Sequence, residues 1–149
     1  MQKLVTILSL FVMISQPVWA MDINSTHSGS WYNRLQDGHG LSVAILDTDR
    51  TLIYWYVYTP DGTPTFLLTV GQNQGDSTTG DTYIQTGMKF GEFNPNDHEL
   101  TMWGTSTVTF HDCNNLTLEY SLDDPAYGSG VIPMTKLVGL SGLECSDSQ

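Results

Sequence analysis

The sequence predicts a small all-β domain: an antiparallel barrel or sandwich of about eight or nine strands, with one disulfide. Apolar residues alternate with a period of two in several short segments, and Gly, Pro, Asn and Asp cluster between those segments. No long window repeats apolar residues at helical spacing. The 17 Thr residues beyond position 20 also favour strands, because a β-branched side chain loses little rotamer freedom there.

The first 20 residues have the layout of a secretory signal peptide. Lys3 supplies the positive charge, residues 4–14 form an apolar run, and residues 18–20 (Val-Trp-Ala) fit a cleavage site. The apolar run is too short to cross a bilayer, which takes about 20 residues. We therefore expect cleavage after Ala20 and a single domain over residues 21–149 that is secreted or periplasmic, with no membrane insertion after cleavage.

The predicted strands follow one another at regular spacing. A short strand around Trp31 comes first, and residues 41–46, 51–59 and 65–72 form a meander because their turns are short enough to join antiparallel neighbours. The polar stretch 73–80 separates this meander from a strand over 81–90, and residues 91–97 form a loop. The remaining strands cover residues 99–103, 106–111, 116–122 and 131–138.

The charge of the chain excludes some classes of partner. Without Lys3, the predicted domain has four Lys and Arg against 16 Asp and Glu, which is a net charge of −12. Nucleic acid and anionic membrane surfaces are poor partners for such a charge. A basic protein is a better one.

Cys113 and Cys145 are the two cysteines of the chain. In an oxidising compartment such a pair predicts one disulfide, which here ties the turn at Cys113 to the C-terminal tail. A loop of this length adds roughly 3–4 kcal/mol of stability in the chain-entropy treatment. A zinc site is not expected, because only His111 lies near either cysteine and the C-x-x-C spacing is missing. We expect no metal and no cofactor.

Two sets of motifs resemble a secreted bacterial domain family without an established activity. The first set is Ser28-Gly29-Ser30-Trp31-Tyr32-Asn33, Gly38-His39-Gly40 and Tyr54-Trp55-Tyr56-Val57-Tyr58. The second is Trp103-Gly104-Thr105, Phe110-His111-Asp112-Cys113-Asn114-Asn115 and Gly128-Ser129-Gly130. Val57 stands where an aromatic residue is usual in that family. The resemblance covers most of residues 21–149 and implies export and a small β domain.

The opening element also has a weaker likeness to the avidins, whose first strand reads G-x-W-Y-N as well. That likeness maps only Asn33 onto a ligand-contacting position. The tryptophans with which avidins bind their ligand have no counterparts at matching spacing, so biotin binding is not expected.

Five aromatic residues and one asparagine are the candidate ligand-binding residues. These are Trp31, Asn33, Tyr54, Tyr56, Tyr58 and Trp103. In a barrel, alternate residues converge on the interior, so these rings and the Asn33 amide are expected to surround a cavity if the interior is not filled. The alternative is that the rings close-pack and form only a core. Gly104, directly after Trp103, is typical of a bend or bulge in a strand.

No catalytic residues are predicted. His39, His98 and His111 lie near Asp37, Asp97 and Asp112, but none belongs to a known nucleophile motif, and an Asp in a turn commonly caps the backbone. The acid pairs Asp47/Asp49 and Asp123/Asp124 lack the spacing of an EF-hand. The sequence therefore predicts a non-catalytic binding module for a glycan, peptide or small apolar molecule. The alternative is an acidic protein–protein interaction module or an inhibitor of a cationic envelope enzyme; a small hydrolase ranks third.

Overall fold

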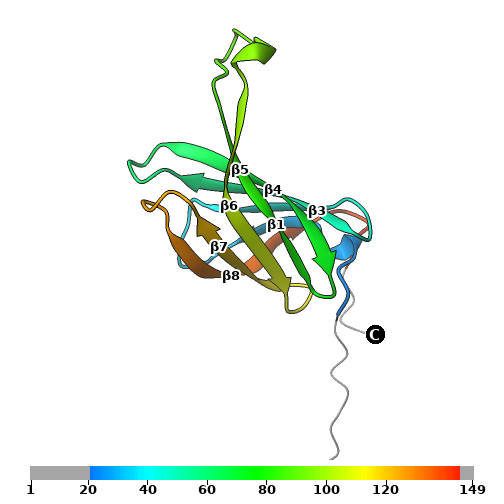
Figure 1. The fold of residues 1–149 in the computed structure, drawn as a ribbon. Helices are drawn as coiled ribbons and strands as arrows, with labels where there is room; N and C mark the ends of the chain where they lie inside the picture. Colours follow the sequence, from blue (N-terminus) through cyan, green and yellow to red (C-terminus); the bar gives the residue numbers. More distant parts are fainter. Residues whose placement is uncertain (1–20, 145–149) are drawn as a thin grey trace, which may run out of the picture.

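The computed structural model describes residues 21–144 and shows a closed antiparallel β-barrel of eight strands (Figure 1). Neighbours in the sequence are neighbours in the barrel, and β1 closes the barrel by pairing with β8. The strands are β1 (Gly29–Tyr32), β2 (Gly40–Ile45), β3 (Arg50–Tyr58), β4 (Pro64–Gln74), β5 (Ser77–Thr86), β6 (Glu99–Phe110), β7 (Asn115–Leu122) and β8 (Ser129–Gly139). Two short 3₁₀ turns, η1 (Ser25–His27) and η2 (Pro95–Asp97), complete the fold.

The all-β prediction is confirmed, and of the two predicted architectures the structure is the barrel. The predicted Cys113–Cys145 disulfide stays a prediction, because Cys145 lies outside the described residues; Cys113 itself is buried in the β6–β7 connection. The predicted signal peptide over residues 1–20 also lies outside them. Among residues 21–144, no helix is long and apolar enough to span a membrane.

Three predicted boundaries are wrong. Residues 73–80 do not separate two parts of the fold: β4 continues to Gln74 and β5 starts at Ser77, with Gly75 at a φ of 60° in the tight turn between them. The polar composition suggested a loop, but Thr78 in this stretch is fully buried, and further buried Thr and Ser side chains lie on β4, β5 and β6. The hydroxyl of Thr82 lies 2.9 Å from that of Thr69 and 2.7 Å from that of Ser106, so these buried groups satisfy one another.

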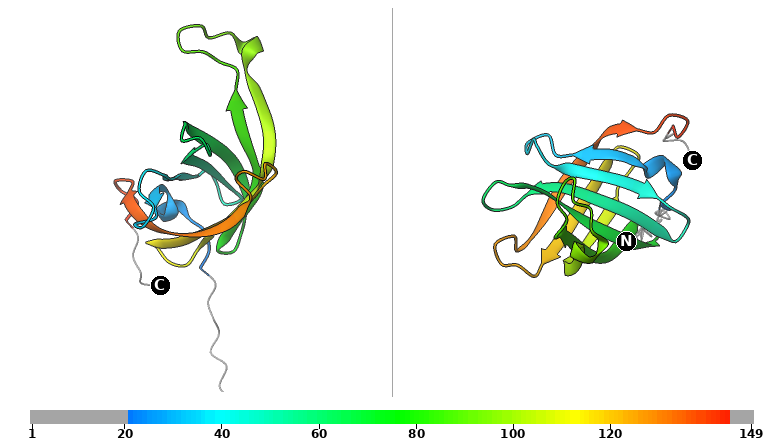
Figure 2. Two further views of the ribbon diagram at one scale, coloured as in Figure 1. Left: turned by 90° about the vertical axis from the view of Figure 1, so that its left-hand side faces the viewer. Right: turned by 90° about the horizontal axis from the view of Figure 1, so that it is seen from above.

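The second wrong boundary concerns the strands predicted over residues 99–103 and 106–111. They are one strand, β6, which has a bulge at Trp103: its pairing with β5 shifts between Thr82 and Tyr83. Gly104 has a φ of 136° and follows the bulged residue, as its sequence position predicted. The strand predicted over 81–90 ends earlier, at Thr86. Beyond it the chain forms an arm, residues 87–98, that stands out from the barrel (Figures 1 and 2).

The core fills the barrel between its two ends. Its largest fully buried side chains are Trp31, Phe110, Leu41, Ile53, Leu67, Leu116 and Leu118. They come from β1, β2, β3, β4, β6 and β7 and meet at the barrel axis, since inward positions alternate along each strand.

Candidate functional site

The two ends of the barrel differ in how they are closed. At one end η1 packs under the strands, and His27 is only 1% exposed, with its ring 4.7 Å from that of Phe110. Trp31 Nε1 donates a hydrogen bond to the His27 carbonyl at 3.2 Å, and Lys136 Nζ donates one to the Thr26 carbonyl at 2.7 Å. These contacts fill what we call the capped end.

The opposite end carries the β1–β2, β3–β4, β5–β6 and β7–β8 connections, because antiparallel neighbours joined in sequence order place alternate connections at alternate ends. A pocket of about 370 Å³ lies at this pocket end. Its lining residues are Gln36, His39, Trp55, Val57, Tyr58, Tyr120, Tyr127 and Ile132. Strands β3, β7 and β8 and two connections thus supply its walls. Half of these side chains are aromatic and only a few are polar, as in small-molecule sites.

A chain of hydrogen bonds orients the polar side of the pocket. Trp55 Nε1 donates to His39 Nδ1 at 3.3 Å, and His39 Nε2 lies 3.1 Å from Gln36 Oε1. Because Nδ1 accepts, the proton of the neutral ring sits on Nε2, which donates to Gln36. Burial lowers the pKa of His39 below its usual value, which favours this neutral form. The pocket therefore presents an uncharged imidazole at neutral pH.

Ring contacts hold the aromatic side of the pocket. The Trp55 and Tyr120 rings are 5.0 Å apart and tilted by 55°, and the Trp103 and Tyr127 rings are 4.4 Å apart, edge to face. Gly130 pairs with Tyr120 across β7 and β8, and a Cβ at Gly130 would lie 2.7 Å from the Tyr120 hydroxyl. Because Gly130 has no side chain, the Tyr120 ring can pack directly over it.

The pocket end has an acidic border. Burial raises the pKa of Tyr127, and the nearby carboxylates of Asp124 and Asp61 raise it further, because a negative charge disfavours the phenolate. Asp124 lies in the β7–β8 connection and Asp61 in the β3–β4 connection. No Lys or Arg is among the residues that line the pocket.

The structure does not bring the six predicted ligand residues together. Trp31 is 1% exposed in the core, and Asn33 caps a turn by accepting a hydrogen bond from Leu35 N at 2.8 Å. Tyr54 and Tyr56 point outward, because the alternate positions of β3 supply the buried side chains of Thr51, Ile53 and Trp55. Two members of the predicted set do reach the pocket region.

Tyr58 lines the pocket directly, and Trp103 packs behind Tyr127. Tyr58 lies at the end of β3, where a Cβ at Gly38 would be 3.3 Å from its hydroxyl. Tyr58 is the one lining residue that the sequence analysis named as ligand-binding. The others are Gln36, His39, Trp55, Val57, Tyr120, Tyr127 and Ile132. The alternation in β3 placed Trp55 on the face opposite the tyrosines, but it did not tell which face points inward.

The three His–Asp neighbours have other partners. His98 Nε2 lies 3.4 Å from Gln85 Oε1, and His111 Nε2 lies 2.6 Å from Thr117 Oγ1. Asp112 Oδ1 accepts hydrogen bonds from the backbone of Asn114 and Asn115, so it holds the β6–β7 turn. Within the described chain, no group of three or more His, Cys, Asp or Glu residues is placed to hold a metal ion.

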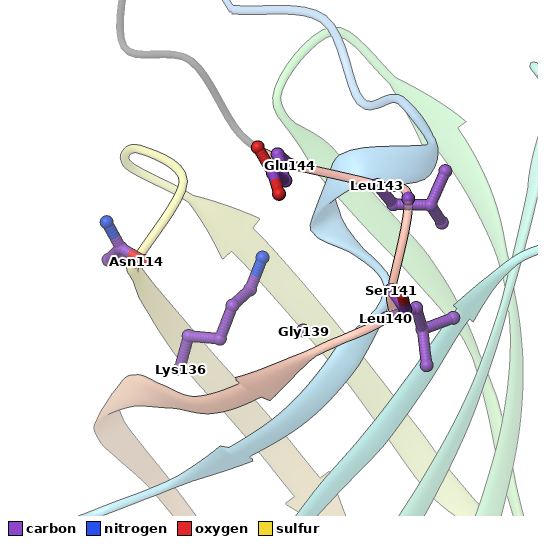
Figure 3. A pocket seen from close by; sticks show the side chains of 8 residues that line it. Asn114, Lys136, Gly139, Leu140, Ser141, Leu143 and Glu144 are labelled. Atoms are coloured by element: carbon purple, nitrogen blue, oxygen red, sulfur yellow. The ribbon is translucent and has the colours of Figure 1, made fainter.

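A second, larger cavity of about 530 Å³ lies at the capped end (Figure 3). Asn114 and Lys136 line it on one side and residues 139–144 on the other. Lys136 already donates to Thr26 and lies 4.7 Å from the centre of the Trp31 ring, and no aromatic side chain lines this cavity. The pocket at the other end, with its four aromatic side chains, is therefore the better candidate.

The resemblance to a secreted bacterial domain family remains a prediction based on motifs. No protein-family model, curated protein or solved structure matches this chain, and the geometry of the pocket is therefore the basis for a function.

Proposed function

We propose that this protein is a secreted, non-catalytic binding module that takes a small extracellular ligand in the pocket of about 370 Å³ between Trp55, Tyr120 and Tyr127. The supporting observation is the composition of this pocket: aromatic walls with a few oriented polar groups, at the end of the barrel that η1 does not cover. Such a site binds by stacking and apolar contact and selects through a few hydrogen bonds.

The polar groups are placed to fix the orientation of a ligand. His39 and Gln36 are linked to Trp55 by hydrogen bonds, so their positions are set before a ligand arrives. Groups that are ordered in advance lose little entropy on binding. None of the pocket contacts forms a nucleophile and base pair, which is why binding is proposed here and not catalysis.

A pocket-filling variant tests the proposal. Glycans, short peptides and small apolar molecules are screened by NMR against residues 21–149, and every ligand found is titrated against Val57→Trp. Val57 lines the pocket, so an indole there occupies the ligand's space. Tyr56→Trp is the matched control, because it adds the same side chain at the next position, which faces outward and is 52% exposed.

We expect Val57→Trp to lose binding and Tyr56→Trp to keep it. Urea unfolding of both variants shows whether they are folded, since overpacking costs roughly 1–3 kcal/mol. A screen without a ligand, or ligands that folded Val57→Trp binds as tightly as the unchanged protein does, would contradict the proposal.

The arm supports a second candidate, an acidic protein–protein interaction module. Phe90 is 100% exposed and Phe93 69% exposed, and their rings are 6.1 Å apart, edge to face. The arm projects from the barrel (Figure 2), so both rings are available to another molecule. An exposed apolar tip on a predicted domain with a net charge of −12 fits a basic protein with an apolar cleft, such as a cationic envelope enzyme.

This candidate is tested by titrating a panel of basic envelope enzymes with the protein at low and high salt. Phe90→Ser should weaken any complex, and Val131→Ser should not, because Val131 is 65% exposed on β8 and away from the arm. If the affinity of a complex changes neither with salt concentration nor with Phe90→Ser, the second candidate is contradicted.

A further inference from the structure

The aromatic rings of the pocket point to a particular ligand charge. Trp55, Tyr58, Tyr120 and Tyr127 all line it, and they come from β3, β7 and the β7–β8 connection. The Trp55 and Tyr120 rings are 5.0 Å apart and tilted by 55°, so they contact each other in the wall of the pocket. The face of an aromatic ring carries negative charge density and attracts a cation within about 6 Å.

The polar side chains of the lining carry no positive charge that would repel a cation. His39 is held in its neutral form by the hydrogen bond from Trp55, and Gln36 is uncharged. Two of the four basic residues of the described chain lie away from the pocket end: Arg50 pairs with Asp47 at 2.8 Å, and Lys136 is at the capped end. A third, Lys89, lies in the arm, which projects from the pocket end, and does not line the pocket. The fourth, Arg34, is exposed in the β1–β2 connection and does not line the pocket.

Two carboxylates lie in connections at this end, and hydrogen bonds within their own turns hold them in place. Asp61 Oδ1 accepts a hydrogen bond from Thr63 N at 3.3 Å, and Asp124 Oδ1 accepts one from Ala126 N at 2.9 Å. Both loops belong to the pocket end, and both carboxylates act on Tyr127, whose ring lines the pocket. A positive ligand therefore gains from the rings and from the border together.

We propose that the ligand of this pocket is an organic cation, a substituted ammonium whose alkyl groups lie against Trp55, Tyr120 and Tyr127 with its charge balanced by Asp61 and Asp124. The inference rests on the proposed small-ligand function and names the chemical class of that ligand. A quaternary ammonium group fits best, because it has apolar methyl groups and no N–H donors that need partners among the ring faces.

A pair of probes with the same shape tests the charge. Choline and its uncharged carbon isostere, 3,3-dimethylbutan-1-ol, differ only in the central nitrogen or carbon of the head group. We expect choline to bind about tenfold more tightly in NMR titrations of residues 21–149, a ratio typical of partly desolvated cation–π contacts. Val57→Trp, which fills the pocket, should abolish choline binding.

Charge-removing variants test the carboxylates. The double variant Asp61→Asn with Asp124→Asn keeps the acceptor oxygens of both turns and should weaken choline several-fold without changing the affinity of the isostere. The matched control is Asp49→Asn with Asp76→Asn, which removes two charges from connections at the capped end and should change neither affinity.

The outcomes separate this inference from the proposed function. The organic-cation inference is overturned if the isostere binds as tightly as choline or more tightly, or if Val57→Trp still binds choline. The small-ligand function then stands if other ligands of the screen lose their affinity for Val57→Trp. If no probe and no screened ligand binds, both are overturned.

Discussion

Gly104→Ala adds one methyl group at the bulge of β6, where the backbone of β7 leaves no room for it. A Cβ at Gly104 would lie 2.2 Å from the Ser121 carbonyl oxygen and 2.7 Å from Leu122 Cα. Its φ of 136° is also one that a side chain disfavours. The backbone strain costs about 1–2 kcal/mol and the crowding about 1–3 kcal/mol, so we expect a total loss of roughly 2–5 kcal/mol. That is a large part of the 5–15 kcal/mol typical of a domain.

Two other glycines separate these contributions. Gly62 has a φ of 89° and no atom within 4 Å of a Cβ, so Gly62→Ala carries the strain alone. Gly40 is not in the left-handed region, but its Cβ would lie 2.5 Å from the Trp31 carbonyl oxygen, so Gly40→Ala carries the crowding alone. The entropy that Ala removes from the unfolded chain is common to all three variants and cancels in the comparison.

The assay is urea unfolding followed by tryptophan fluorescence at neutral pH, which suits a small domain that unfolds in one step. The reasoning is refuted if Gly104→Ala loses no more stability than Gly62→Ala. In that case β6 and β7 are not in close contact at the bulge. A loss near the sum of the two single effects supports the argument.

Three further predictions concern the capped end, the pocket and the arm. Burial lowers the pKa of His27, so the unfolded chain binds a proton that the folded chain does not: stability should fall as pH drops below about 6.5, by up to about 1.4 kcal/mol per pH unit until the lowered folded pKa is reached. His27→Gln should reduce that slope in urea unfolding at a series of pH values, and an unchanged slope would contradict it. Gly130→Ala should displace the Tyr120 ring and shift the NMR signals of the pocket residues, at a cost of roughly 1–3 kcal/mol; unshifted signals would count against the role given to Gly130. Phe90→Ser with Phe93→Ser should leave the unfolding free energy within about 0.5 kcal/mol of its original value, because exposed side chains contribute little, and a larger loss would mean that the arm packs on the barrel.

Local patterns were sufficient for the fold class. The alternation in residues 51–59 and the turn residues Asp61-Gly62 mark a strand and its hairpin connection, and β3 and β4 have that form. Gly104 marked the bulge for the same reason, since only glycine fits such a backbone without strain. These features depend on neighbours in the sequence, and the residues concerned are close together along the chain.

The threonine-rich stretch around Thr78 shows where composition fails. A polar sequence suggested a connection, but Thr78 and Thr82 are buried, and Thr82 shares hydrogen bonds with Thr69 and Ser106. Those partners are 13 and 24 residues away from Thr82. The stability of a buried hydroxyl depends on such distant partners, so the local sequence does not reveal it.

The prediction of the pocket also required knowledge of contacts between residues that are distant in the sequence. Both faces of β3 carry large apolar or aromatic side chains, so its alternation shows that Trp55 and Tyr56 point in opposite directions but not which one points inward. Closure of the barrel through β1 and β8 answers that question, because it gives each strand an inside. The pocket then combines Gln36, Trp55 and Tyr127, which are far apart in the chain and lie together only because closure sets the register of all eight strands.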